Sequence, residues 1–161
     1  MNNDYAVIGI DPGLSIAMAR IDGDGDLTHC FTCDKDSTPT EWMQLLKGMR
    51  TYSGRKPTVV CESVFGMPHQ DLSSTLKLVR PRFILEGIVS ALEYEWMAVP
   101  AAVWKKHFNL PGGAANKQLS VKAVNSYWPK KYARFKGNRA HDKAEAALMA
   151  LWYVQTHITN D

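Results

Sequence analysis

The sequence lacks any long apolar run. None of its segments approaches the roughly 20 consecutive apolar residues that a membrane-spanning helix requires. Residues 1–11 also lack the basic stretch followed by an apolar run that marks a secretory signal. We therefore expect a protein of a cytoplasmic compartment with no membrane partner.

Cysteine is scarce, with three residues in a chain of 161. Cys30 and Cys33 form one C-x-x-C pair. A structural zinc site would need a second pair of ligands at a suitable spacing, and the sequence offers none. We expect these two cysteines to be reduced, half-buried residues of a strand.

Acidic residues are missing from one long stretch. Residues 96–141 contain nine lysines and arginines and no Asp or Glu, whereas residues 1–50 contain eight acids and four bases. A charge run is often only a solvated surface, but this one spans 46 residues. It is also interleaved with aromatic residues: Trp104, Phe108, Tyr127, Trp128, Tyr132 and Phe135. Together these features favour a face that binds a polyanion such as nucleic acid.

A single domain is expected over residues 1–161, because the sequence shows no repeat, low-complexity tract or linker. Residues 5–10 are a compact apolar run, which predicts a buried strand ending at Asp11. Further short strands are predicted over residues 15–21, 27–33, 57–62 and 96–100. The Asp-Gly-rich residues 22–26 supply a hairpin turn between the second and third strands.

Two helices carry clear start signals. Thr38, Pro39 and Glu41 give an N-cap, a proline in the first turn and a capping box. Asp71 is a suitable N-cap for a long helix that runs toward Tyr94. Pro81 lies inside that helix and is expected to kink it or to split it in two.

Two more helices are predicted near the C-terminus, over residues 117–127 after an Asn116 cap and over residues 140–156. The resulting order is three strands, a helix, a strand, a helix, a strand and two helices. Strands joined by hairpins are antiparallel and strands joined through helices are parallel. We therefore expect an α/β fold with a mixed five-stranded sheet and helices on both faces.

Four acids fall at positions that suit a shared site. Asp11 and Glu62 end two predicted strands, and Asp142 and Glu145 are spaced i, i+3 on one face of the last helix. Each also has an ordinary explanation: a turn residue for Asp11, a surface strand end for Glu62, and favourable first-turn charges for the helix pair.

If the first and fourth strands are neighbours, the four carboxylates converge. Such a cluster is costly unless a cation lies within it. Mg²⁺ prefers hard oxygen ligands, and two ions about 4 Å apart can activate a water and stabilise the leaving oxygen of a phosphodiester. The acids and the basic stretch together predict phosphodiester hydrolysis.

Five ordered segments resemble one family, the RuvC Holliday-junction resolvases, whose fold is ribonuclease-H-like. They are I-G-I-D-P-G from Ile8, C-E-S-V-F from Cys61, L-K-L from Leu76, the stretch from Val99 to Lys122, and H-D-K-A-E-A-A-L-M-A from His141. The resemblance covers nearly the whole chain. The short motif D-P-G alone is weak, but five matches in the right order are specific.

The resemblance implies a magnesium-dependent homodimer, with two ions and Mn²⁺ as a substitute, that cuts four-way DNA junctions by paired symmetric nicks. It implies no nucleotide cofactor. The implied metal ligands are Asp11, Glu62, Asp142 and Glu145. The implied DNA contacts are Phe65, Lys105, Lys106, Lys117 and Lys122, with Lys117 close to the scissile group and Phe65 stacked on a base.

Three departures qualify the resemblance. Glu145 stands where the family usually has Asp. His141 beside Asp142 orients a ligand, activates water or simply caps the helix. Pro81 falls in the helix that forms the family's dimer interface, so the geometry of the interface is open. Phe65 also has an alternative role as a core aromatic. The relaxed last acid and the small size favour a divergent, phage-type member, whose compartment is then the host cytoplasm.

Other functions remain as alternatives. A ribonuclease-H-fold nuclease acting on flaps or RNA fits the same residues, and a non-catalytic junction-binding module fits the basic stretch. The complete set of four acids argues against a pure binder, since carboxylates facing phosphate only weaken binding. An ATP-binding protein of the actin-like fold needs two domains, for which 161 residues are too few.

Overall fold

The computed structural model describes residues 5–13, 15–51, 54–64, 71–112 and 117–158. The strands are β1 (Ala6–Asp11), β2 (Ala17–Asp22), β3 (Leu27–Thr32), β4 (Thr58–Glu62) and β5 (Glu95–Val99). The helices are α1 (Pro39–Gly48), α2 (Leu72–Ala91), α3 (Ala101–His107), α4 (Lys117–Tyr127), the 3-10 helix η2 (Pro129–Phe135), α5 (Ala140–Tyr153) and the π-helical η3 (Val154–Ile158).

The strands form one open mixed sheet in the order β3-β2-β1-β4-β5. β1, β2 and β3 pair antiparallel, and Gly25, with φ +80°, closes the β2–β3 hairpin in the left-handed conformation that glycine favours. β1, β4 and β5 pair parallel, because helical connections return the chain to the same edge of the sheet. The predicted mixed five-stranded sheet and the adjacency of its first and fourth strands are confirmed.

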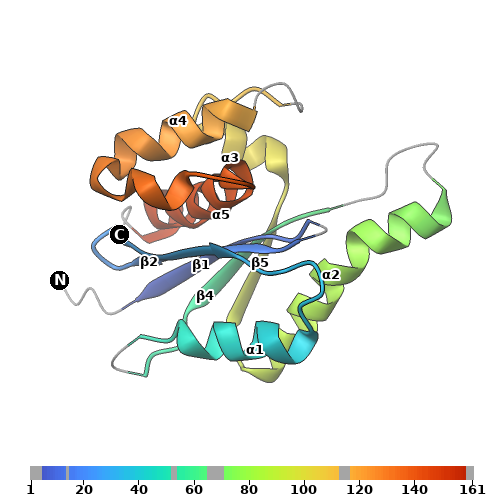
Figure 1. Cartoon of the computed structure of the whole chain (residues 1–161). Helices are drawn as coiled ribbons and strands as arrows, with labels where there is room; N and C mark the ends of the chain where they lie inside the picture. Colours follow the sequence, from blue (N-terminus) through green and yellow to red (C-terminus); the bar gives the residue numbers. More distant parts are fainter. Residues whose placement is uncertain (1–4, 14, 52–53, 65–70, 113–116, 159–161) are drawn as a thin grey trace.

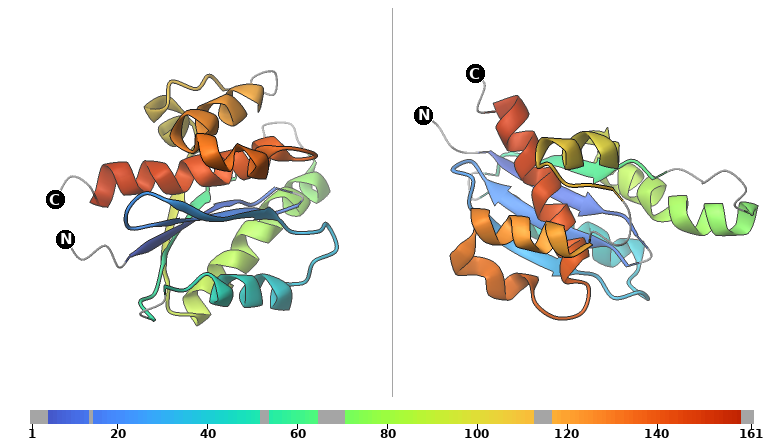
Figure 2. Two further views of the ribbon diagram at one scale, coloured as in Figure 1. Left: turned by 60° about the vertical axis from the view of Figure 1, so that its left-hand side comes forward. Right: turned by 90° about the horizontal axis from the view of Figure 1, so that it is seen from above.

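Helices cover both faces of the sheet (Figures 1 and 2). α3, α4 and α5 lie on one side, and α1 and α2 lie on the other. Alternate residues of β1 face opposite sides: Val7 enters the core under α5, and Ile8 enters the core above α1 and α2. The sheet therefore separates two apolar cores, one on each of its faces.

The contact between α5 and β1 is unusually close. A Cβ atom placed on Gly9 would lie 1.9 Å from the carbonyl oxygen of Ala146 and 3.0 Å from the backbone nitrogen of Ala150. Only glycine leaves room for the helix backbone at this point. Several buried alanines of α5 are also small, so the helix packs closely on β1, the strand that ends in Asp11.

The helix signals in the sequence are largely confirmed. Thr38 and Glu41 form the capping box of α1, and the Asp71 side chain accepts the backbone N–H of Ser74 at the start of α2. The prediction for Pro81 was wrong as to a split, since α2 runs through it as one helix. The predicted cap Asn116 lies outside the described residues.

Two elements were not predicted, the short helix α3 and the 3-10 helix η2. Both lie in the basic stretch, where few apolar residues recur at helical spacing. α3 begins two residues after β5 ends. Because Val99 at the end of β5 pairs with Glu62, α3 begins near the end of β4. α5 also ends earlier than predicted, because the chain passes into η3 at Val154.

The cysteines do not form a site. Cys30 lies half-buried in β3, as expected, but Cys33 follows the end of that strand and is buried. Both are free, and they belong to the cores on opposite faces of the sheet. Burial raises the pKa of the Cys30 thiol to about 12 and that of Cys33 to about 11. Among the described residues, no helix is long and apolar enough to cross a membrane.

We predict that Gly9→Ala destabilises the protein by at least about 3 kcal/mol, because the new methyl group meets backbone atoms that no side-chain rotation can move. Urea unfolding measures the loss. The matched control is Gly48→Ala at the end of α1, where a Cβ meets nothing within 4 Å. A Gly9→Ala protein as stable as this control would contradict the close contact.

Candidate metal centre and nucleic-acid interface

Two of the predicted acids end neighbouring parallel strands. Ile10 pairs with Cys61, so the next residues, Asp11 and Glu62, lie side by side at the carboxyl ends of β1 and β4. The backbone N–H of Gly13, in the turn after β1, donates to the Asp11 carboxyl. The strand register, rather than a flexible loop, therefore fixes both acids at one edge of the sheet.

The helix α5 adds the other two acids. Asp142 and Glu145 lie in its first two turns, above the end of β1. Burial and, in order, the charges of Glu62, Asp142 and Glu145 raise the pKa of Asp11 to about 8. The charges of the other three predicted acids therefore all act on Asp11, at the end of β1.

Glu62 is held by residues of α3. The indole nitrogen of Trp104 donates to Glu62 Oε2 at 3.1 Å, and the Trp104 ring is fully buried. Burial raises the pKa of Glu62, and the nearby Lys105 ammonium acts in the opposite direction. The short helix α3, which the sequence analysis missed, thus orients one of the site's carboxylates.

Glu145 has partners from two other helices. Lys105 Nζ lies 3.1 Å from Glu145 Oε1, and the hydroxyl of buried Ser120 on α4 donates to the same oxygen at 3.2 Å. These contacts explain how a residue longer than aspartate is accommodated, because its carboxylate reaches across to α3 and α4.

Asp142 is also engaged on both oxygens. Arg139 Nε donates to Asp142 Oδ2 at 2.6 Å, and His141 Nε2 lies 2.7 Å from Asp142 Oδ1. Arg139 has a left-handed backbone, with φ +61°, and also donates to the backbone oxygen of Ser15. This conformation turns the chain into α5 and lets one guanidinium join the β1–β2 connection to the helix.

The donor set suits a hard divalent cation, since it consists of carboxylates whose mutual repulsion a cation relieves. In the arrangement described, however, no three His, Cys, Asp or Glu side chains of residues 5–13, 15–51, 54–64, 71–112 and 117–158 close around one point as metal ligands. The two observations agree once the ion pairs are considered, because Lys105 and Arg139 already occupy carboxylate oxygens.

Of the predicted DNA-binding lysines, Lys105 contacts a site acid, Glu145. Lys105 and Lys106 line one hollow next to α3, and Lys106, Lys117 and Lys122 are exposed. Lys117 begins α4 one turn before Ser120, so both lie toward the same face of that helix. Lys105 therefore borders the carboxylates directly, and Lys117 begins the helix that carries Ser120, a partner of Glu145.

Of the six aromatic residues named in the basic stretch, Phe108 is partly buried against the core under α5, and the other five divide into two groups. Trp104, Trp128 and Phe135 are buried in the core, so the expectation that they belong to a polyanion-binding face was wrong. Tyr127 and Tyr132 remain exposed, with 44% and 36% of their surface accessible. Phe65 lies outside the described residues.

Three residues of the site were missed from the sequence: Trp104 and Ser120 as donors, and Arg139 as an ion-pair partner. Trp104 and Ser120 fall within segments that carry the family resemblance, so their places were marked although their contacts were not. Arg139 precedes Asp142 by three residues, a spacing that brings side chains together on one helix face.

The fold is similar to that of two solved RuvC structures. RuvC of T. thermophilus in complex with a Holliday junction substrate superposes with a TM-score of 0.65 at 15% identity, covering 92% of each chain. A Thermus thermophilus RuvC structure superposes with a TM-score of 0.61 at 19% identity, covering 94% of this chain and 96% of the other. The expected RuvC-like, ribonuclease-H-like fold is thereby confirmed.

A more distant likeness is to the yeast mitochondrial Holliday junction resolvase Ydc2. It has a TM-score of 0.53 at 14% identity and covers 94% of this chain and 78% of the yeast chain. No protein-family model and no curated protein sequence matches. The likeness therefore lies in the fold, at sequence identities below 20%.

The raised pKa of Asp11 predicts a pH-dependent effect of Asp11→Asn on stability without metal. A carboxyl whose folded pKa is raised stabilises the fold fully below its unfolded value near 3.8, and that stability is lost as pH rises through about 8. In EDTA, Asp11→Asn should be more stable than wild type by about 2–5 kcal/mol at pH 9 and by far less at pH 4.

Urea unfolding of both proteins across this pH range measures the difference. Asp36→Asn removes one exposed carboxylate that is not among the four site acids, so it controls for the loss of one charge. A difference between Asp11→Asn and wild type that stays constant with pH would show that Asp11 is not strained by its neighbours.

Proposed function

We propose that this chain is a metal-dependent endonuclease that resolves Holliday junctions by paired symmetric cleavage. The observation that carries the proposal is the convergence of four carboxylates at the end of β1, on a fold similar to RuvC. Lys105 contacts Glu145 in this cluster, and with the other proposed lysines it would bind the phosphodiester that the acids and their metal cut.

Asp11, Glu62, Asp142 and Glu145 are the proposed ligands of two Mg²⁺ ions, with Mn²⁺ as a substitute. When bound, such ions supply an activated water and stabilise the leaving oxygen. Trp104 and Ser120 keep Glu62 and Glu145 oriented through neutral hydrogen bonds, which cost the site no competing charge. The contact between His141 and Asp142 favours an orienting role for this histidine.

The proposed DNA contacts are Lys105, Lys106, Lys117 and Lys122, which approach phosphate oxygens around the carboxylates. The base-stacking role of Phe65 remains a prediction from the resemblance alone. No nucleotide cofactor is proposed.

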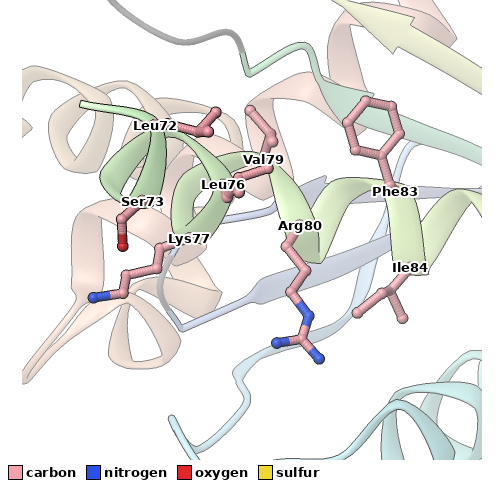
Figure 3. Close-up of a pocket in the computed structure, with 8 residues that line it drawn as sticks. All are labelled: Leu72, Ser73, Leu76, Lys77, Val79, Arg80, Phe83 and Ile84. Atoms are coloured by element: carbon pink, nitrogen blue, oxygen red, sulfur yellow. The ribbon is translucent and has the colours of Figure 1, made fainter. Parts of the chain in front are cut away.

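The proposed homodimer uses the outer face of α2. Leu72 is 73% exposed, Leu76 is 54% exposed and Phe83 is 57% exposed. All three line one open hollow (Figure 3). Large apolar side chains gathered on a surface mark an interaction site. A second copy of α2 satisfies this face on both partners at once, as a two-fold interface requires.

The decisive experiment is cleavage of labelled four-way, three-way, flap and linear DNA with Mg²⁺. We expect paired cuts at symmetric positions of the four-way junction. Asp11→Asn and Glu62→Gln should each reduce cleavage by at least about a thousandfold, equivalent to roughly 4 kcal/mol of transition-state stabilisation. Both variants should bind the junction as tightly as wild type or more so, because they remove charge that repels phosphate.

The same assay separates the alternatives. Cutting of flaps or RNA in preference to junctions would make the protein a different ribonuclease-H-fold nuclease. Tight junction binding without any cleavage would make it a binding module. Asp36→Asn, at an exposed acid outside the carboxylate site, is the matched control and should cut at the wild-type rate.

The dimer proposal predicts that Phe83→Glu gives a monomer, since a charge on the hollow cannot be buried against a second copy. Light scattering after size exclusion measures the mass, and a melting scan checks the fold. Ser90→Glu, on the same helix but outside the hollow, should stay dimeric. A Phe83→Glu protein that is still dimeric would move the interface away from this face.

A further inference from the structure

Two of the four site acids are neutralised by the protein's own cations. Lys105 Nζ lies 3.1 Å from Glu145 Oε1. Arg139 contacts Asp142 Oδ2 through both Nε, at 2.6 Å, and Nη2, at 2.5 Å. All four side chains are largely buried, with 13–25% of their surface exposed, so water screens these pairs less than it screens surface ion pairs.

These cations and a divalent metal compete for the same oxygens. A carboxylate oxygen that accepts a charge-assisted hydrogen bond offers less electron density and a less favourable direction to a metal. Glu145 Oε1 also accepts from Ser120, and the other oxygen of Asp142 faces His141. The contacts of Glu145 and Asp142 therefore account for the absence of a closed ligand cage among the described side chains.

Lys105 and Arg139 could each bind another acceptor in place of the site carboxylates. Arg139 Nη1 is buried and has no hydrogen-bond partner among the described residues, an arrangement that costs free energy unless an acceptor arrives. Lys105 lines the hollow beside α3 together with Lys106. A DNA phosphate at this edge of the site offers oxygens to both groups.

We infer that Lys105 and Arg139 form a latch that holds Glu145 and Asp142 away from the metal until DNA phosphate draws the two cations off. The inference rests on the proposed function and adds its regulation: metal and DNA bind with positive coupling. Without DNA the site favours its internal ion pairs, and with DNA the released carboxylates turn toward the metal. Coupling of this kind is reciprocal, so metal also tightens DNA binding.

The first test is the affinity of the free protein for Mn²⁺, measured by calorimetry. Lys105→Gln and Arg139→Gln should each raise this affinity about fivefold or more, because each removes a competing cation. Lys130→Gln and Arg134→Gln remove the same charges from exposed positions that the proposal does not use, and they should change the affinity less than twofold. Melting scans in EDTA confirm that every variant is folded.

The second test is the coupling itself. Junction affinity is measured by fluorescence anisotropy with and without Ca²⁺, a hard cation with oxygen ligands, and a gel confirms that the DNA stays intact. Ca²⁺ should tighten binding by wild type about fivefold or more, and this ratio should fall toward one in the Lys105→Gln, Arg139→Gln double variant. Using a ratio removes the direct loss of a phosphate contact from the comparison.

The outcomes are distinguishable. If the latch variants bind Mn²⁺ no better than their charge-matched controls, or if the Ca²⁺ ratio is unchanged in the double variant, the latch is overturned while the metal site stands. If neither wild type nor any variant binds Mn²⁺, and no junction is cut, the proposed function is overturned and the latch with it.

Discussion

The close approach of α5 to β1 at Gly9 is the contact on which the candidate site depends. Because no side chain separates the helix from the strand there, the first turns of α5 lie directly above the end of β1. Asp142 and Glu145 therefore meet Asp11 and Glu62 through backbone packing rather than through loop conformation. A site built on packed elements keeps its geometry without a ligand to organise it.

The electrostatic consequence is that four carboxylates share a poorly hydrated edge, and the rest of the site compensates. The neutral donors are Trp104 of α3 and Ser120 of α4. The charged donors are Lys105 of α3 and Arg139, which immediately precedes α5. The basic stretch thus has a second role besides attracting polyanions. Part of its charge belongs to the internal balance of the site.

The sequence predicted the parts of the molecule that follow from local rules. The capping box at Thr38, the strand ends at Asp11 and Glu62, and the pairing of Asp142 with Glu145 all came from spacing and residue type. It failed where tertiary contacts decide. The burial of Trp104, Trp128 and Phe135 depends on what packs over them. α2 also continues through Pro81 as one helix, although local rules disfavour proline in a helix interior. The partners of each carboxylate could not be predicted, since they come from elements distant in the chain.

The order of the elements in the chain has a consequence for protein synthesis. Asp11 lies in the first strand, and Asp142 and Glu145 lie in the last α-helix, which packs on that strand. Domains generally fold as units during synthesis, and β1 cannot receive α5 before residues 140–153 have been made. The four acids come together only after α5 has emerged. Translation thus delays assembly of the carboxylate cluster until α5 is available to pack on β1.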